Sequence, residues 1–253
     1  MKMFGNTPDD LFDAPMREFP WPAKALYWVC LVVVSAFTKL YWHWTCDGSL
    51  PYAKPGEQTG KVIIANHASM FDPVVLIMIS AFRGRRLRPL YKSEFESSSF
   101  VNWFFSRVGA IPLKRGSADT KAIRRAVKSL QRGEDVCVFP EGTRIRDPHA
   151  RAEIHGGFAL IAQMAKADVV PVAIDGSHRI SPKGKGFPHP ARVRIRYGEA
   201  LSLDDVAGAS RRERCDELER VAMARVYAMR AELRGEEPID AGDVNGEGDK
   251  AAR

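Results

Sequence analysis

The chain has 253 residues, of which 45% are hydrophobic and 27% are charged. This composition is typical of a globular protein and excludes a disordered chain, a collagen or a polytopic membrane protein. The formal net charge is +7, and residues 235–253 hold six acids against two bases, so residues 1–234 carry +11. A body this basic favours partners that carry phosphate, such as nucleic acid, anionic lipid or a phosphorylated metabolite.

The first 46 residues are expected to form a membrane-anchoring segment. Residues 1–20, which contain Pro, Gly and several acids, predict an irregular lead-in. The uncharged run Ala25–Phe37 follows, bracketed by Lys24 and Lys39 and flanked on both sides by aromatic residues. At ~1.5 Å per residue it reaches about 20 Å, less than the roughly 30 Å of a bilayer's hydrocarbon core. It therefore favours an interfacial or re-entrant anchor, while a true span and a buried core helix stay open.

Short apolar runs alternate with helical stretches through the remainder of the chain. The expected strands are Val62–Ala65, Leu87–Tyr91, Ala110–Leu113, Asp135–Phe139, Val169–Ile174 and Arg192–Tyr197. The expected helices are Pro73–Phe82, Phe100–Val108, Ala118–Gln131, Ile154–Ala167 and Arg211–Leu233. This alternation predicts an α/β fold with a mostly parallel sheet flanked by helices, which we place at residues 47–234 after a linker at 47–60. The acidic, Gly-rich residues 235–253 predict a disordered tail.

The cysteines and histidines do not point to a metal or to disulfides. Four cysteines are scattered without a CxxC pair, and the six histidines do not cluster near them. We therefore expect reduced thiols in a chain that faces the cytosol, and no structural metal.

One candidate catalytic pair follows the first strand of the α/β region. Residues just past the carboxyl end of a strand face the ligand crevice in an open α/β sheet. His67 stands there and is suited to general-base work, because the pKa of a histidine lies near neutrality. Asp72 could accept the other ring N–H and so fix the tautomer of His67. Asp72 before Pro73 also fits a helix N-cap, so this motif alone is a weak signal.

Two further segments place cations or a carboxylate after a strand. In Phe139–Arg144 (FPEGTR), Arg144 can offer two N–H donors to a phosphate, and Glu141 can accept from a substrate hydroxyl or orient an arginine. In Gly109–Arg115 (GAIPLKR), a strand runs into Lys114 and Arg115. Each segment taken singly also fits a plain turn or strand end.

Together these segments resemble the glycerolipid acyltransferase family, the PlsC-like 1-acylglycerol-3-phosphate acyltransferases. That family is marked, in this order, by NHxxxxD, an arginine-ending G-x-I-x-x-x-R block, FPEGTRS and a V-x-P-V-x-I strand. The chain carries NHASMFD at 66–72, GAIPLKR at 109–115, FPEGTR at 139–144 and VVPVAI at 169–174. The resemblance covers residues 61–173 in register. A chance match to six consecutive residues is on the order of a few per million chains.

The resemblance implies an acyltransferase that moves a fatty acyl group onto the free hydroxyl of 1-acylglycerol 3-phosphate and so makes phosphatidic acid for phospholipid biosynthesis. It implies His67 as the general base and Asp72 as the residue that orients it. The acceptor's glycerol phosphate would be held by Arg115, Glu141, Gly142, Thr143 and Arg144. Acyl-CoA or acyl-carrier protein would be the co-substrate, with no other cofactor and no metal.

The resemblance also implies that the enzyme is membrane-associated, with its active site facing the cytoplasm. A basic cluster of four arginines (Arg83, Arg85, Arg86, Arg88) is expected to rest against anionic headgroups, or else to form a solvated loop. A nucleic-acid partner is not expected, because the aromatic residues sit in apolar runs and not among exposed basic residues.

Two departures from the family pattern leave the acceptor open. Ile145 stands where a serine is common, and residues 151–157 read RAEIHGG where lysines usually precede a glycine. Lyso-ornithine lipid, another lysophospholipid and glycerol 3-phosphate remain alternative acceptors. A thioesterase or other hydrolase would use the same His67 and Asp72 pair with water as the nucleophile, and a lipid-binding protein with a dead site is disfavoured because both residues are present.

Overall fold

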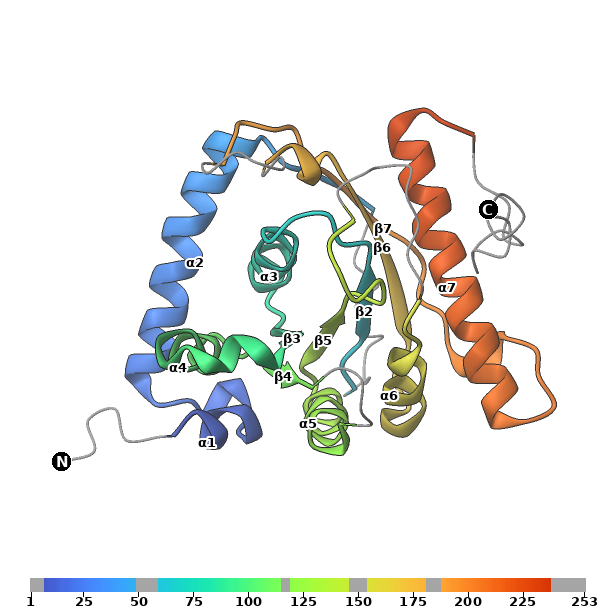
Figure 1. Cartoon of the computed structure of the whole chain (residues 1–253), viewed down its shortest axis with the longest axis horizontal. Helices are drawn as coiled ribbons and strands as arrows, with labels where there is room; N and C mark the ends of the chain where they lie inside the picture. Colours follow the sequence, from blue (N-terminus) through green and yellow to red (C-terminus); the bar gives the residue numbers. More distant parts are fainter. Residues whose placement is uncertain (1–6, 49–58, 115–118, 146–153, 181–187, 238–253) are drawn as a thin grey trace.

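The computed structural model describes residues 7–48, 59–114, 119–145, 154–180 and 188–237. Seven strands form one sheet in the order β1-β7-β6-β2-β5-β3-β4 (Figure 1). Every neighbouring pair is parallel except β6 and β7, which are antiparallel. The strands are β1 (Thr45–Asp47), β2 (Val62–Ala65), β3 (Leu87–Lys92), β4 (Ile111–Leu113), β5 (Asp135–Val138), β6 (Val169–Asp175) and β7 (Arg194–Tyr197). The predicted mostly parallel α/β sheet is confirmed.

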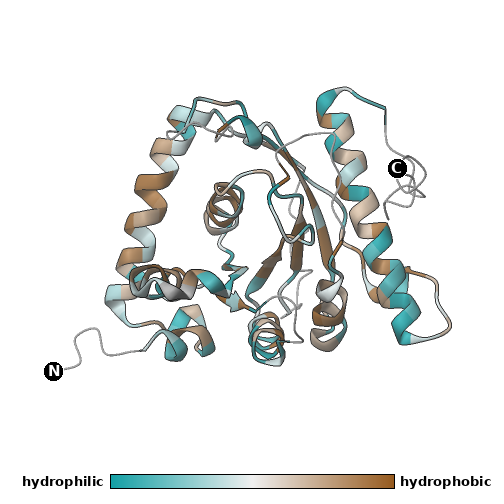
Figure 2. Cartoon of the chain, in the orientation of Figure 1, coloured by the Kyte–Doolittle hydropathy of each residue, from teal (hydrophilic) through white to brown (hydrophobic). Residues whose placement is uncertain are grey.

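Helices cover both faces of this sheet. They are α1 (Pro8–Asp13), α2 (Trp21–Trp42), α3 (Asp72–Phe82), α4 (Ser99–Arg107), α5 (Thr120–Gln131), α6 (Gly157–Ala165) and α7 (Arg211–Arg234). In β2, Ile63 and Ala65 join a core cluster with α2 and α3, whereas Val62 and Ile64 join one with α5, α6 and α7. Because both faces are covered, β2 and β6 are buried along their whole length, and their ribbons are among the most hydrophobic in Figure 2.

The expectation of an irregular lead-in over residues 1–20 is wrong for the part that the structure describes. Thr7 caps α1 in a capping box with Asp10, and Pro8 occupies the first helical position. Leu11 and Phe19 belong to the same core cluster as α3. The start of the chain is therefore packed onto the α/β domain, and its capping signal is visible in the sequence Thr7–Asp10.

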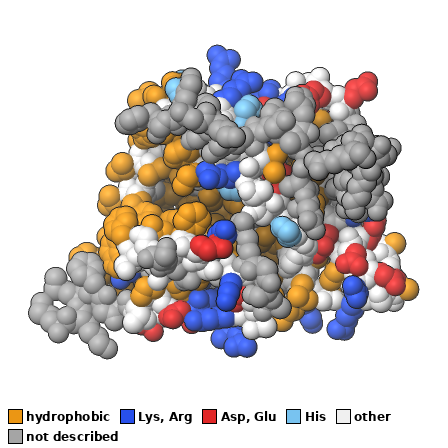
Figure 3. Space-filling view, viewed as in Figure 1, with side chains coloured by type: hydrophobic (Ala, Val, Ile, Leu, Met, Phe, Trp, Pro, Cys, Tyr) orange, Lys and Arg blue, Asp and Glu red, His pale blue; other side chains and the backbone are white. Residues whose placement is uncertain are grey.

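The apolar segment forms a longer helix than the uncharged run suggested. α2 has 22 residues and includes Lys24 and Lys39, so at ~1.5 Å per residue it is about 33 Å long. Its buried residues follow one stripe: Ala23, Tyr27, Leu31, Ser35, Thr38 and Trp42. Leu40 and Val33, on the rest of the helix, are 79% and 60% exposed. One side of α2 thus packs on the protein and an apolar side is left outside, where Figure 3 shows hydrophobic side chains gathered over α2 and α4.

Among the described residues, α2 is the one helix that is long and apolar enough to cross a membrane. Length and composition carry this finding, and a core helix or a signal sequence would pass the same test. Only 28% of the apolar window is buried inside the protein, which separates α2 from an ordinary core helix. It is weak support for the expected membrane association.

The four clustered arginines do not form one headgroup-binding surface. Arg88 is fully buried and Arg85 pairs with Asp135. Arg83 contacts the sulfur of Cys46, and Arg86 lies over the rings of Tyr27 and Trp28. The expectation of a shared exposed cluster is therefore wrong, because a β-strand (β3) begins inside the run and turns Arg88 into the core.

Candidate active site

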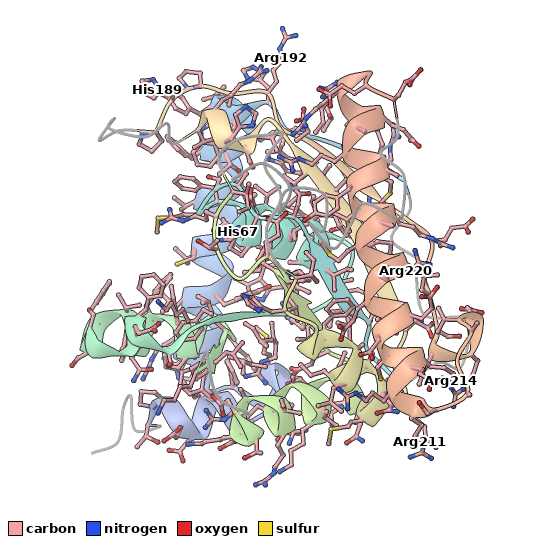
Figure 4. All side chains as sticks on the ribbon, turned by 45° about the vertical axis from the view of Figure 1, so that its right-hand side comes forward. His67, His189, Arg192, Arg211, Arg214 and Arg220 are labelled. Atoms are coloured by element: carbon pink, nitrogen blue, oxygen red, sulfur yellow. The ribbon has the colours of Figure 1, made fainter. Side chains whose placement is uncertain are left out.

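The candidate site lies where β2, β5 and β6 end. These three strands are neighbours and run parallel, so their carboxyl ends meet at one edge of the sheet. His67 follows β2, Glu141 follows β5, and Asp175 ends β6. Figure 4 places His67 in the interior of the molecule, whereas Arg211, Arg214 and Arg220 lie along α7 away from it. The sheet thus brings together groups that are far apart in the sequence: the side-chain amide of Asn66 donates a hydrogen bond to the backbone carbonyl of Ile174, 108 positions away.

His67 and Asp72 form a hydrogen-bonded pair. Nδ1 of His67 lies 3.0 Å from Oδ2 of Asp72, and the same oxygen accepts hydrogen bonds from the backbone N–H groups of Ala68 and Ser69 at 2.7 and 2.8 Å. Asp72 is only 1% exposed. Since its carboxylate accepts from Nδ1–H, the Nε2 atom of His67 is left as a proton acceptor.

The helix-cap interpretation of Asp72 does not describe this geometry. Asp72 is the first residue of α3, and Phe71 is the N-cap. The Asp72 side chain turns back onto the loop that carries His67. Pro73, the next residue, has no backbone N–H of its own to compete for that carboxylate.

The loop after β5 holds the backbone of His67 from both sides. Oε2 of Glu141 accepts a hydrogen bond from the His67 N–H at 2.8 Å, and the His67 carbonyl accepts one from the Ile145 N–H at 2.7 Å. The ring of Phe139 stacks on the imidazole with 4.3 Å between centroids. The FPEGTR segment therefore fixes the position and the plane of the candidate base.

Glu141 is enclosed by the protein. It is 2% exposed, and its second oxygen, Oε1, accepts from the hydroxyl of Tyr227 at 3.1 Å. Burial raises the pKa of Glu141, while the hydrogen bonds from His67 and Tyr227 and the charge of Arg230 lower it. With both carboxylate oxygens occupied inside the protein, Glu141 is placed to orient His67.

The FPEGTR loop reaches the surface after Gly142. Gly142 has a φ of +63°, and a Cβ there would lie 2.5 Å from the His155 ring, so a side chain would be strained by both conformation and space. Thr143 and Arg144 are exposed. Arg144 forms no ion pair within the described part of the chain, which leaves its guanidinium open to an anion. Arg115, the other expected phosphate-binding arginine, lies outside the described residues.

Sequence reasoning missed two residues of α7. Tyr227 and Arg230 are buried at 5% and 4% exposure and face Glu141, about 90 residues away along the chain. Their signal in the sequence is a tyrosine and an arginine three residues apart on the buried side of a charged helix. Such a pattern is common, and it does not reveal which strand end the helix covers.

Comparison with known proteins assigns this site to a class. Residues 52–175, just under half of the chain, match the family model described as acyltransferase. The likeness to the PlsC-like 1-acylglycerol-3-phosphate acyltransferases is confirmed by the following relatives.

The chain is 26% identical over 168 residues to the 1-acyl-sn-glycerol-3-phosphate acyltransferase of Streptococcus pneumoniae, covering 64% of this chain and 60% of that protein. It is 32% identical over 112 residues to the lyso-ornithine lipid O-acyltransferase of Pseudomonas aeruginosa, covering 44% of this chain and 41% of that protein. The chain thus spans less than two thirds of either relative.

A solved structure shares the fold. PlsC from Thermotoga maritima, a 1-acyl-sn-glycerophosphate acyltransferase, superposes with a TM-score of 0.63 at 25% identity. The match covers 85% of this chain and 80% of that one. It therefore extends well beyond residues 52–175.

Proposed function

We propose that this chain transfers a fatty acyl group from acyl-CoA or acyl-carrier protein to the free hydroxyl of 1-acylglycerol 3-phosphate, giving phosphatidic acid. The observation that carries the proposal is the His67–Asp72 pair at 3.0 Å, held at the carboxyl edge of the sheet by a loop with the family's FPEGTR sequence. General-base chemistry needs an acceptor nitrogen, an orienting carboxylate and a fixed ring, and this site has all three.

The reaction follows from the orientation of the imidazole. Nε2 of His67 takes the proton of the acceptor hydroxyl as its oxygen attacks the thioester carbonyl carbon. Asp72 stabilises the imidazolium that forms. When the carbon–sulfur bond breaks, the imidazolium returns the proton to the leaving thiolate, so that the products are the ester and a free thiol. No acyl-enzyme intermediate is required.

The acceptor's phosphate suits the exposed part of the same loop. Arg144 and Thr143 are exposed beside the His67 backbone, and a guanidinium binds phosphate with two parallel hydrogen bonds. Arg115 is proposed as a second phosphate ligand because GAIPLKR matches the family block. Glu141 and Gly142 contribute by shaping the loop.

The apolar side of α2 fits a membrane-bound substrate. The acceptor carries an acyl chain and partitions into the bilayer, so an enzyme that rests on the membrane meets it there. We place the active site on the cytoplasmic side, where both thioester donors occur. Liposome flotation tests this: Val32→Gln with Val33→Gln, both at exposed positions of α2, should release the protein, whereas Leu160→Gln on α6 should not. Unchanged flotation of the double variant would contradict membrane contact through α2.

A product assay tests the reaction and the acceptor together. Purified protein in mixed micelles receives an acyl-CoA and, in separate reactions, lysophosphatidic acid, lyso-ornithine lipid or glycerol 3-phosphate, with products identified by mass spectrometry. Phosphatidic acid formed from the first acceptor supports the proposal. Acylated product from lyso-ornithine lipid alone would assign the acceptor of the Pseudomonas relative, and free fatty acid alone would make the chain a thioesterase.

A further inference from the structure

The C-terminal helix α7 supplies polar side chains to the back of the candidate site, although it lies outside the matched residues 52–175. It packs against β6, the strand beside β2. Tyr227 and Arg230 lie three residues apart, so they share the face that is turned to the sheet, together with the buried Met223 and Val226. These two side chains therefore reach the strand ends from the side opposite α3.

Tyr227 forms a hydrogen bond with the FPEGTR loop. Its hydroxyl donates to Oε1 of Glu141 at 3.1 Å, and Oε2 of Glu141 accepts from the His67 N–H at 2.8 Å. The route from α7 to the candidate base thus passes through two hydrogen bonds, a buried one from Tyr227 and a part-buried one from His67. Hydrogen bonds to a buried carboxylate are stronger than those between neutral groups.

Arg230 adds a positive charge in the same place. Its Nε atom is buried without a hydrogen-bond partner among the described residues, and no described carboxylate forms an ion pair with it. The charges that act on it are Glu141 after β5, Asp175 of β6 and Arg234 on its own helix. Asp175 is already paired with Arg194 and Arg234. Glu141, in contrast, forms no ion pair within the described part of the chain, and the charge of Arg230 acts on it.

We propose that Tyr227, supported by the charge of Arg230, is a positioning residue for the reaction: through Glu141 it fixes the backbone N–H of His67 and hence the imidazole. This inference rests on the proposed function for the role of His67. Burying a guanidinium is costly to the fold, and the position of Arg230 is explained by the effect of its charge on Glu141.

The pair opposes the effect of burial on the pKa of Glu141. Burial raises the pKa of Glu141, and Tyr227, Arg230 and the His67 N–H all oppose that rise. Removing Tyr227's hydroxyl or Arg230's charge raises this pKa further, so the carboxyl takes a proton at a higher pH. A neutral carboxyl is a weaker acceptor for the His67 N–H. As the pH is lowered, the activity of such a variant should therefore begin to fall at a higher pH than that of wild type.

The test compares Tyr227→Phe with Tyr197→Phe. Tyr197 is also buried, but its hydroxyl has no partner among the described residues, so it controls for loss of a buried hydroxyl. Tyr227→Phe should lower kcat on the order of 10-fold, with unchanged acceptor KM, and move the acidic limb of kcat to higher pH. In a Glu141→Gln background, Tyr227→Phe should leave that limb in place. Equal effects of the two Tyr→Phe variants would overturn the proposal.

Arg230→Met separates positioning from support of the fold. Met keeps the apolar stem and removes the charge that acts on Glu141, so the acidic limb of kcat should move to higher pH whatever the change in Tm. A residue needed only for structure would lower Tm and leave the pH profile unchanged, and that result would contradict the role of Arg230.

Hydrogen exchange at the His67 backbone amide provides a readout that needs no substrate. Exchange should be faster in Tyr227→Phe than in wild type or Tyr197→Phe. If exchange rises but no acylated product forms from any acceptor, the proposed function fails and the positioning role stands. If product forms at unchanged kcat and exchange is unchanged, the positioning role fails.

Discussion

Charged side chains lie at both edges of the sheet, and their surroundings differ between the two edges. At the amino edge, where β3 and β5 begin, Arg88 and Arg85 are satisfied inside the protein. Arg88 donates hydrogen bonds to the carbonyls of Leu11, Phe12, Ala14 and Gly109, to the Ser129 hydroxyl and to Glu134. At the carboxyl edge, Nε2 of His67 and the exposed guanidinium of Arg144 have no hydrogen-bond or ion-pair partner among the residues that the structure describes. The comparison teaches that partners, and not the charge itself, distinguish a structural arginine from a functional one.

The largest effect is expected at Asp72, the acid that orients His67 at the carboxyl edge of the sheet. Asp72→Asn keeps the shape and an oxygen that can accept from Ala68 and Ser69, but it removes the charge that holds Nδ1–H of His67. We expect kcat to fall by about 10²–10⁴ with little change in Tm. Steady-state kinetics with circular dichroism measures both. A loss of less than a few-fold would show that the pair does not work as a base and its orienting acid.

At the amino edge of the sheet, a substitution is expected to lower the stability of the protein. Arg88→Met leaves Glu134 as a buried charge without its cation and removes the donors for three carbonyls of the α1 end. Loss of one partner of a buried pair costs about 3–5 kcal/mol, which urea denaturation detects as a lower midpoint. The folded fraction should keep its kcat. If Arg88→Met instead lost kcat by the amount expected for Asp72→Asn, at unchanged stability, the structural role given to the amino edge would be contradicted.

A smaller effect is expected from substitution of Arg144, the exposed arginine at the carboxyl edge of the sheet. Arg144→Ala should raise the acceptor KM about 10-fold and leave kcat and Tm nearly unchanged, because a guanidinium–phosphate contact on the surface is made in the ground state. Arg144→Lys should retain part of the affinity. If the donor KM rises and the acceptor KM does not, Arg144 belongs to the thioester donor's site.

The smallest effect concerns a partly buried carboxyl on α7 that lies next to the first residues of α6. The Glu219 carboxyl lies against Gly156, and burial raises its pKa to about 8. In the unfolded chain it ionises near pH 4.5, so the native state loses stability as pH rises from about 4.5 to 8. Glu219→Gln removes this loss and should raise Tm by a few degrees at pH 9 but not at pH 4.5. A Tm difference that does not grow with pH would contradict the raised pKa.

The sequence predicted the parts of the molecule whose signals are local. Buried parallel strands are continuous apolar runs, so β2 and β6 were found within a residue of their observed ends. His67, Asp72 and Glu141 were singled out because each comes shortly after a strand, and the ends of parallel strands meet at one edge of the sheet.

The parts that were not predicted depend on packing between distant segments. The burial of Arg88 could not be read from a run of four arginines, because it depends on where the end of α1 lies. Tyr227 is 86 residues from Glu141, and its position on α7 fixes its face of the helix but not its partner. The short β1 was missed because three residues carry too little pattern to stand out beside an aromatic helix end.

The most direct test of the central claim is the rate of phosphatidic acid formation by wild type and His67→Ala in the same mixed micelles, with acyl-CoA and lysophosphatidic acid. The account predicts product from wild type and a loss of at least about 100-fold in His67→Ala, with circular dichroism and Tm retained. Activity of His67→Ala within a few-fold of wild type would contradict it.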